Sequence, residues 1–327
     1  MSAPNGPQEL RFDGTVAIVT GGGRGLGRSH ALLLAQRGAR IVVNDPGVAL
    51  DGTGADPAPA NETAAMIRAA GGDAVVSTAD IGTASGAQET IDQALEHFGQ
   101  LDILVNSAGI VKHANFDDTT LADFDEHLHV HLRGSFAMAK AAWPHLTAQG
   151  FGRIVLTSSP GIFGRANIVP YASAKAGLIG LGRSLADAGF SFDIKVNVIL
   201  PVALTRMTAD RLESSRDTTS PLASTLTAGR VSALVAVLTH RDCPSTGEMF
   251  YVAGDTVAHA YLAQSLSAPR ARLTPEDVLE DWAAIMDDSH SAHAPFPWPG
   301  VDAWPPSTDP DTTEVPRAPA VGRVVGR

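Results

Sequence analysis

The sequence predicts an α/β fold in which helices cover both faces of a doubly wound, mostly parallel seven-stranded sheet. Short β-branched runs alternate with helix-length segments from residue 14 onward, and several of these runs are apolar at nearly every position. Such runs are typical of parallel strands covered on both faces, and parallel pairing needs a crossover that a helix usually supplies. We expect strands at Val16–Thr20, Arg40–Asn44, Ala74–Thr78, Ile103–Asn106, Arg153–Thr157, Lys195–Leu200 and Met249–Val252.

Helical periodicity places two of the helices. One apolar face has the spacing i, i+3, i+4 and i+7, at Ile91, Ala94, Leu95 and Phe98. Near the end of the chain, Thr274 can cap a helix whose first position is Pro275 and whose first turn is acidic. Three later residues share one face of that helix, which predicts about three turns: Val278, Trp282 and Ile285.

These patterns divide the chain into three parts. Residues 1–265 are expected to form the sheet domain, and residues 266–293 a C-terminal helical extension of the same domain. Residues 294–327 are expected to be an irregular tail, because prolines recur there without periodicity. Two tryptophans of the tail, Trp298 and Trp304, could dock on a neighbouring surface.

The composition narrows the class of protein. The 327 residues carry a formal net charge of −11 with no Lys/Arg cluster, so binding to nucleic acid or to an anionic membrane surface is not expected. No apolar run approaches the roughly 18 residues that span a bilayer, and the first residues lack a signal-peptide pattern. A single cysteine, Cys243, excludes an intrachain disulfide. We therefore expect a cytoplasmic protein.

A glycine-rich loop follows the first expected strand directly. Residues 20–27 read Thr-Gly-Gly-Gly-Arg-Gly-Leu-Gly, and a helix is expected to begin there. Glycine lets the backbone turn tightly and approach a pyrophosphate, while the amides at the start of the helix face the phosphates. The place of this loop between a strand and a helix favours a dinucleotide site over a plain turn. The expected contacts are Gly21, Arg24, Gly25, Leu26 and Gly27.

Two residues bear on which dinucleotide is bound. Asp45 follows the second strand, where a carboxylate binds the ribose hydroxyls of NAD and repels the 2′-phosphate of NADP. Its alternative role is to cap the turn before Pro46. Arg24 favours NADP, because its cation can pair with that phosphate. We expect NAD on the strength of Asp45, with NADP as the alternative.

A long loop is expected after the second strand, because residues 46–59 are rich in Gly, Pro and Asp. It is either a mobile surface insertion or a cover for the cofactor.

A tyrosine and a lysine lie four residues apart, at Tyr171 and Lys175, on one face of an expected helix. The nearby ammonium favours the phenolate and is expected to lower the pKa of Tyr171, so that the phenol exchanges a proton with a substrate oxygen. This pair alone is common on helix surfaces. Because Ser158 and Ser159 end a strand shortly before it, and the glycine loop opens the same domain, we interpret the pair as catalytic.

Taken together, these motifs resemble those of the NAD(P)-dependent short-chain dehydrogenases in order and spacing. The matching motifs are Thr20–Gly27, Asn106–Gly109, the Ser158/Ser159 pair, Tyr171 with Lys175, and Asn197 with Pro201. The sequence is also similar to the (3R)-hydroxyacyl-CoA dehydrogenase part of peroxisomal multifunctional enzyme type 2. VVNDPG at 42–47, HLRGSF at 131–136 and the helix start at 274–278 carry this closer resemblance.

The resemblance implies a Rossmann-like fold and a role for each matching residue. Tyr171 would be the general acid/base, Lys175 would bind the nicotinamide ribose, and a serine would orient the substrate oxygen. The further cofactor contacts that it implies are Asp80, Ile81, Asn106, Ala108, Gly109, Pro201, Leu204 and Thr205, together with Tyr171 and Lys175 themselves.

The sequence departs from the family pattern at the serine. The residue thirteen positions before Tyr171 is Ser158, whereas alignment of the preceding strand selects Ser159, because one residue is deleted in the loop that follows. A strand fixes the face to which each side chain points, so we prefer Ser159.

A second departure is His131, at the position that usually carries a catalytic asparagine. This histidine either holds a water for proton relay or packs between helices without a catalytic role. His127 and His129 lie close in sequence, but no acid or cysteine accompanies them at ligand spacing, so no metal site is expected.

These features predict reversible hydride transfer between NAD and a small-molecule secondary alcohol or its ketone. The resemblance implies a 3-hydroxyacyl-CoA substrate in lipid metabolism, with a hydroxysteroid as the alternative and a catalytically silent nucleotide-binding scaffold as an alternative of another class. Arg270 and Arg272 are candidate cations for the phosphates of CoA. The resemblance also implies a homodimer or homotetramer.

Overall fold

The protein is described by a computed structural model, which defines residues 9–205, 207, 225–265, 273–289 and 291–296. The chain forms two compact units, residues 1–259 and residues 260–327. The predicted boundaries at 265 and 293 stay predictions, and most of the predicted tail lies outside the described residues, together with Trp298, Trp304, Arg270 and Arg272.

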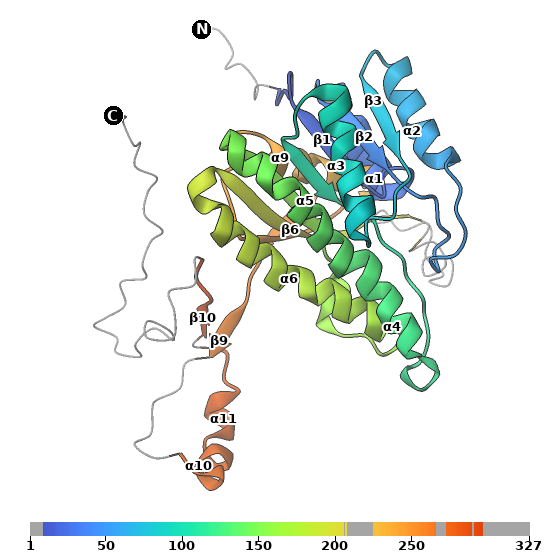
Figure 1. The fold of residues 1–327 in the computed structure, drawn as a ribbon. Helices are drawn as coiled ribbons and strands as arrows, with labels where there is room; N and C mark the ends of the chain where they lie inside the picture. The colour runs from blue at the N-terminus through green and yellow to red at the C-terminus, as the bar shows by residue number, and fades with distance from the viewer. Residues whose placement is uncertain (1–8, 206, 208–224, 266–272, 290, 297–327) are drawn as a thin grey trace, which may run out of the picture. The chain divides into compact units, whose positions relative to one another are not determined.

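The first unit contains the predicted sheet (Figure 1). Its strand order is β3-β2-β1-β4-β5-β6-β7-β8, and the neighbours from β3 through β7 pair in parallel. The strands are β1 (Val16–Thr20), β2 (Arg40–Asn44), β3 (Ala74–Ser77), β4 (Ile103–Asn106), β5 (Gly152–Thr157), β6 (Ile194–Val202), β7 (Met249–Ala253) and β8 (Thr256–Ala260). β8 is an addition to the seven expected strands. It follows β7 after two residues, Gly254 and Asp255, and so short a connection joins antiparallel neighbours.

Helices cover both faces of this sheet, which confirms the predicted doubly wound fold (Figure 1). α1 (Gly25–Gln36) packs between α2 (Ala58–Ala69) and α9 (Ala228–Thr239) on one face. α3 (Ala84–Phe98), α5 (Gly134–Gln149) and α6 (Val169–Gly189) pack in that order on the other. A shorter helix, α4 (Leu121–His127), leads through a π-helical turn, η2 (Leu128–Arg133), into α5.

The core forms because the central strands are apolar and covered on both sides. Every residue of β1, β4 and β5 is buried. In α3, the face predicted from periodicity is the buried one, with Ile91, Ala94 and Phe98 against the core. Each fully buried Val, Ile or Phe side chain contributes about 1.5–3 kcal/mol. The strands therefore provide a rigid frame for the loops at their carboxyl ends.

The second unit contains two short helices, α10 (Pro275–Glu280) and α11 (Trp282–Ile285), and the antiparallel strands β9 (Ala263–Ser265) and β10 (Ser291–His293). Thr274 caps α10 as predicted, in a reciprocal pair with Asp277. The expected continuous helix is interrupted at Asp281, whose φ of −84° and ψ of 1° leave the helical range. Within the described segments, every helix is too short or too polar to cross a lipid bilayer.

Candidate active site

The candidate site lies at the carboxyl edge of the sheet, where the chain leaves β1 toward one face and β4 toward the other. Ligands bind at such a reversal of strand order in open α/β sheets. Two adjoining cavities are found there. The glycine-loop cavity, of about 570 Å³, is lined by Gly21, Asp45 and Asp80 among others. The Tyr171 cavity, of about 530 Å³, is lined by Ser159, Tyr171 and Lys175 among others. Leu26, Ser107, Gly109, Thr205 and Met207 line both, so the two cavities share a wall.

The glycine loop has the geometry that requires glycine. Gly21 has a φ of +64°, and a Cβ there would lie 2.7 Å from the Cα of Ala108. A Cβ on Gly27 would lie 2.2 Å from the carbonyl oxygen of Gly21. Arg24 precedes α1 without a side-chain capping bond, and the first turn of α1 holds no acidic residue. The first amides of α1 therefore remain available to a phosphate at the positive end of the helix.

Asp45 caps a turn and lies at the wall of the glycine-loop cavity. Its Oδ2 accepts a hydrogen bond of 2.9 Å from the amide of Gly23, and its Oδ1 accepts one of 2.8 Å from the amide of Gly47. It thus caps its own turn while lining the glycine-loop cavity. Arg24 forms an ion pair with Asp56 at 3.7 Å. The carboxylate of Asp45 is therefore held at the cavity by two amides, whereas the cation of Arg24 is shared with an acid.

The loop after β2 forms one wall of the glycine-loop cavity. Residues 48–50, 52 and 54 line it. The amide of Asp56 donates to the carbonyl of Pro46, which closes the loop, and the amide of Val111 donates to the carbonyl of Leu50 at 2.9 Å. These bonds place the segment against the cavity, in accord with a covering role.

Asp80 and Ile81 line the glycine-loop cavity. His129 also lines it, although the sequence did not indicate His129 as a cofactor contact. His129 Nε2 lies 2.8 Å from Asp80 Oδ2, and the amide of Gly82 donates to Asp80 Oδ1 at 2.9 Å. The signal for His129 is weak, because the residue lies 49 positions away and on another element.

Two of the three cofactor contacts expected at and after the end of β4 lie in the site. Ala108 and Gly109 line the glycine-loop cavity. Thr20 Oγ1 accepts from the amides of Ser107 and Ala108, both at 3.1 Å, and so fixes this segment. Asn106 lines neither cavity: it is buried, and its Nδ2 donates to the carbonyl of Ser135 at 3.4 Å.

Tyr171 and Lys175 lie on α6, one turn apart, and both line the Tyr171 cavity. The Lys175 ammonium donates a hydrogen bond of 2.6 Å to the carbonyl of Thr157 and lies 5.8 Å from the centre of the Tyr171 ring. Burial lowers the pKa of Lys175 to about 7. Burial also raises the pKa of Tyr171, against the opposing effect of its hydrogen bond with Ser159. The expectation that Lys175 lowers the pKa of Tyr171 is therefore wrong for the protein alone, because desolvation of the phenolate dominates.

The two adjacent serines have different partners. Ser159 is hydrogen-bonded to Tyr171, and its Oγ accepts from the amide of Gly161 at 3.0 Å. Ser158 is buried, and its Oγ donates to the carbonyl of Lys175 at 2.8 Å. Ser159 thus lies beside the phenol, while Ser158 ties α6 to the end of β5.

His131 lies in the π-helical turn η2 and is fully buried in the wall of the Tyr171 cavity. Its Nε2 donates to the carbonyl of Ile110 at 2.9 Å, while its buried Nδ1 has no partner. Its ring meets that of Tyr171 edge to face at 5.3 Å. Burial and the charge of Lys175 hold the pKa of His131 well below its usual value, so the imidazole is neutral.

His127 stacks on His131 at 6.0 Å, and its Nδ1 donates to the carbonyl of Asp123. Among the described residues no group of three or more His, Cys, Asp or Glu side chains could hold a metal ion.

The end of β6 and the residues that follow it contribute two of their three expected contacts. Pro201 lines the Tyr171 cavity, and Thr205 lines both cavities. Leu204 lines neither and is partly exposed, while its amide donates to the carbonyl of Leu226. The remaining apolar wall includes Val111, Ile168, Met207 and Leu226.

This arrangement places an ionisable phenol, a serine hydroxyl and an ammonium beside a dinucleotide-type loop, which defines an oxidoreductase acting on CH–OH groups with NAD(P). The chain belongs to the short chain dehydrogenase family, whose sequence pattern matches residues 15–216.

Two much longer proteins are similar to this chain over most of its length. The chain is 38% identical over 288 residues to the peroxisomal multifunctional enzyme type 2 of Mus musculus, covering 86% of this chain and 38% of that protein. It is 36% identical over 297 residues to the peroxisomal hydratase-dehydrogenase-epimerase of Neurospora crassa, covering 89% and 32%. The chain thus spans between 32% and 38% of the length of these two relatives. The crystal structure of a short chain dehydrogenase from Mycobacterium avium superposes with a TM-score of 0.72 at 35% identity, covering 84% of this chain and 94% of that one.

Proposed function

We propose that the protein interconverts a 3-hydroxyacyl-CoA thioester and its 3-oxo form with NAD. The observation that carries this proposal is the Tyr171 cavity, where Tyr171, Ser159 and Lys175 lie close to the apolar side chains of Val111, Ile168, Met207 and Leu226. This cavity shares Leu26 and Gly109 with the glycine-loop cavity. An apolar wall suits an acyl chain. The names of the multifunctional relatives, which include a dehydrogenase combined with a hydratase, support this class of substrate.

The residues present fit a dinucleotide. The first amides of α1 can hold its phosphates, Asp45 can hold the hydroxyls of its adenosine ribose, and Asp80 with Ile81 can flank its adenine. When bound there, NAD would supply the hydride acceptor for oxidation of the alcohol, and NADH would supply the hydride for reduction of the ketone. The two amides that hold Asp45 keep a negative charge where NADP carries a phosphate, which supports NAD over NADP.

The chain itself handles the proton. Ser159, already hydrogen-bonded to Tyr171, orients the substrate hydroxyl toward the phenol oxygen. As the hydride leaves the carbon, the phenolate of Tyr171 takes the hydroxyl proton, and in the reverse direction the phenol returns it to the ketone oxygen. The ammonium of Lys175 can bind the nicotinamide ribose, and its charge opposes the burial that raises the pKa of Tyr171. The unpartnered Nδ1 of His131 can hold a water through which the proton leaves.

The test is turnover with purified protein. NAD and NADP are each mixed with a panel of 3-hydroxyacyl-CoAs and hydroxysteroids, and the absorbance of reduced cofactor is followed. We expect NAD to be reduced with the thioesters. Steroid turnover without thioester turnover would overturn the proposed substrate, and NADP preference would overturn the role of Asp45. Full activity in Tyr171→Phe would overturn the mechanism.

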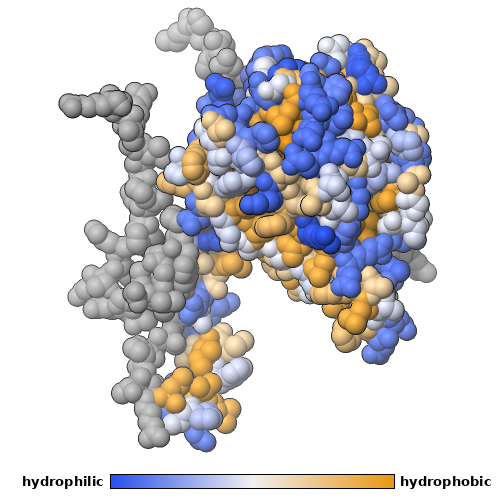
Figure 2. Space-filling view, viewed as in Figure 1, coloured by the Kyte–Doolittle hydropathy of each residue, from blue (hydrophilic) through white to orange (hydrophobic). Residues whose placement is uncertain are grey.

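We also propose that the chain assembles with copies of itself. On the helical face shown in Figure 2, hydrophobic residues gather among hydrophilic ones. A hollow beside α4, η2, α5 and α6 is lined by Leu128, Leu132, Phe136 and Leu181, with Asp125, Glu126, His129 and Arg133 also in its lining, and Phe136 is 53% exposed. An exposed apolar patch of this kind marks an association site. Light scattering is expected to give the mass of a dimer or tetramer, and the mass of a monomer would refute this.

A further inference from the structure

The Tyr171 cavity differs in charge from the protein around it. The chain holds 35 acidic residues against 24 Lys and Arg. Among the described residues, however, no Asp or Glu lines this cavity, whereas Lys175 and Arg165 do, together with His113 and the neutral His131. The glycine-loop cavity, by contrast, is lined by three acids, Asp45, Asp80 and Glu126, as well as by Arg24 and Arg28. A cavity with basic but no acidic side chains favours an anionic ligand over a neutral or cationic one.

The proposed mechanism gives no function to Arg165. It lies between two short turns, Pro160–Phe163 and Ala166–Ile168, in the loop that begins with Ser159. Ser159 and the buried Ile168 hold the two ends of this loop at the cavity, and the amide of Ala114 donates to the carbonyl of Asn167. The position of Arg165 is therefore set by the same loop that positions the serine beside Tyr171.

The guanidinium of Arg165 has no competing acid. Among the described residues it forms no ion pair, in contrast to nearby Lys112, which pairs with Asp123, and to Arg24, which pairs with Asp56. Arg165 is exposed and also lines the cavity, so it lies where the cavity opens to solvent. An unpaired guanidinium at such an opening is suited to a phosphate or carboxylate, which it can bind with two parallel N–H donors.

We infer that Arg165 binds an anionic group at the end of the substrate remote from the reacting carbon. This inference rests on the proposed function for the identity of the anion, which is then a phosphate of the CoA moiety. The alcohol lies inside, beside Tyr171 and Ser159, and the charged end remains at the solvent-exposed opening, where an anion keeps most of its hydration. Lys175 is deeply buried and hydrogen-bonded to Thr157, so it cannot bind this remote group.

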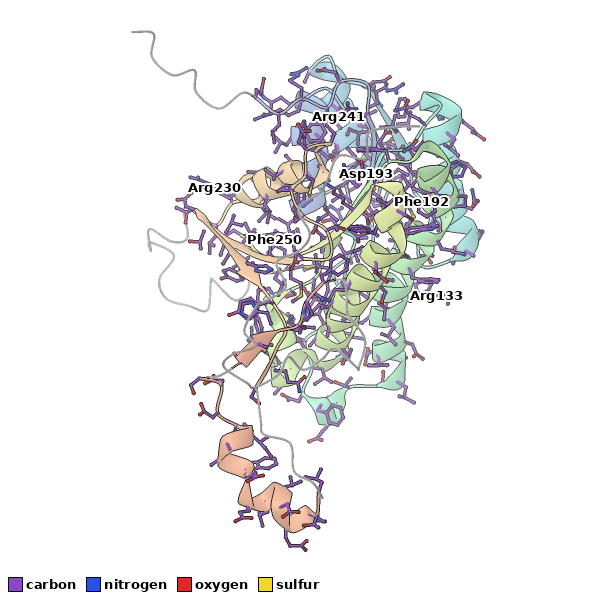
Figure 3. All side chains as sticks on the ribbon, turned by 90° about the vertical axis from the view of Figure 1, so that its left-hand side faces the viewer. Arg133, Phe192, Asp193, Arg230, Arg241 and Phe250 are labelled. Carbon is purple, nitrogen blue, oxygen red and sulfur yellow. The ribbon has the colours of Figure 1, made fainter. Side chains whose placement is uncertain are left out.

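The experiment compares two thioesters of one 3-hydroxyacyl group, one of CoA and one of N-acetylcysteamine, which lacks phosphates. Activity is measured at saturating NAD for the wild type, Arg165→Gln and Arg165→Lys. Arg241→Gln is the matched control. This substitution also removes one exposed arginine. Arg241 lies at the amino ends of β5 and β6, where its backbone carbonyl accepts a hydrogen bond from Arg153 near Asp193 (Figure 3).

We expect Arg165→Gln to raise the ratio of the two KM values, CoA thioester over N-acetylcysteamine thioester, by about three- to tenfold, as befits one exposed charge-assisted contact. Arg165→Lys should restore most of the ratio, and Arg241→Gln should leave it at the wild-type value. An unchanged ratio in Arg165→Gln would overturn the inference, as would equal losses with both thioesters, which indicate a disturbed loop.

Two further arms separate this inference from the proposed function. If the wild type turns over neither thioester, the proposed function fails, and calorimetric titration of the NAD-loaded protein with CoA tests Arg165 directly. Weaker binding to Arg165→Gln than to the wild type supports the anion site, and equal binding overturns it. An N-acetylcysteamine thioester whose acyl chain ends in a carboxylate tests the other source of the anion. Selective loss with that thioester alone assigns Arg165 to an acyl carboxylate and overturns the phosphate.

Discussion

The buried ammonium of Lys175 should cost the folded protein stability, so that Lys175→Met yields a more stable but inactive protein. Burial lowers the pKa of Lys175 from 10.5 to about 7. At about 1.36 kcal/mol per pKa unit, the charged side chain costs roughly 4 kcal/mol at pH 7. Methionine has a similar length and no charge, but it loses the hydrogen bond to the carbonyl of Thr157, worth about 1 kcal/mol. We expect a net gain of roughly 2–3 kcal/mol.

The direction of the pKa shift decides how the stability cost of Lys175 changes with pH. Because the pKa is lowered in the folded protein, the unfolded chain binds the proton more tightly between pH 7 and pH 10.5. The cost of Lys175 is therefore full below about pH 7 and is lost as the pH rises through this window. At pH 10 it falls below about 1 kcal/mol, and Lys175→Met should then be no more stable than the wild type.

Urea unfolding of the cofactor-free protein, followed by circular dichroism at pH 7 and pH 10, measures both values. Lys140→Met, an exposed lysine on α5, is the matched control and should change stability little at either pH. Activity of Lys175→Met should fall at least about a hundredfold. A variant at Lys175 that is less stable than the wild type at pH 7, or equally more stable at both pH values, would refute the reasoning.

Three further substitutions test other parts of the site. In Gly27→Ala the new Cβ would lie 2.2 Å from the Gly21 carbonyl oxygen, so the loop must move, and titration should show NAD binding weakened about tenfold or more; unchanged affinity would contradict the assigned loop. Asp45→Asn keeps the shape of the side chain but removes its charge, and should lower the KM for NADP relative to that for NAD about tenfold; a constant ratio of the two constants would dismiss Asp45 as the selector. His131→Phe keeps an aromatic ring but leaves the Ile110 carbonyl without its donor and cannot hold a water, so it should lower stability by about 1–3 kcal/mol and also lower kcat. His131→Asn can hold a water and should recover activity; equal kcat for all three proteins would make His131 a packing residue only.

The parts of the fold that depend on local sequence could be predicted. β1, β4 and β5 are short apolar runs, and strands with this pattern are buried whichever neighbours they take. The pairing of Tyr171 with Lys175 follows from the helical repeat alone. The choice of Ser159 over Ser158 used the strand register, and the side chains do point to different partners. β8 has no such signal, because four of its five residues are exposed.

Other parts of the site depend on contacts between distant segments. His129 meets Asp80 across 49 residues, and the loop after β2 becomes a cavity wall through a bond between Leu50 and Val111. The upward shift of the pKa of Tyr171 depends on burial, which neither residue type nor spacing conveys. The sequence around Arg165 likewise indicates only an ordinary loop arginine, and its place in the lining of the Tyr171 cavity becomes visible only in the folded protein.

Burial lowers the pKa of both basic groups beside Tyr171. Lys175 has a pKa of about 7 and His131 stays neutral, because both are removed from water. The same desolvation that lowers stability leaves the amine of Lys175 able to accept a proton near pH 7, beside the phenol that takes one from the alcohol, whereas His131 stays unprotonated. Exposing Lys175 to solvent would stabilise its charged form and remove that capacity. Since both effects arise from burial, a substitution that relieves the cost in stability at Lys175 also removes the amine whose pKa lies near neutral pH.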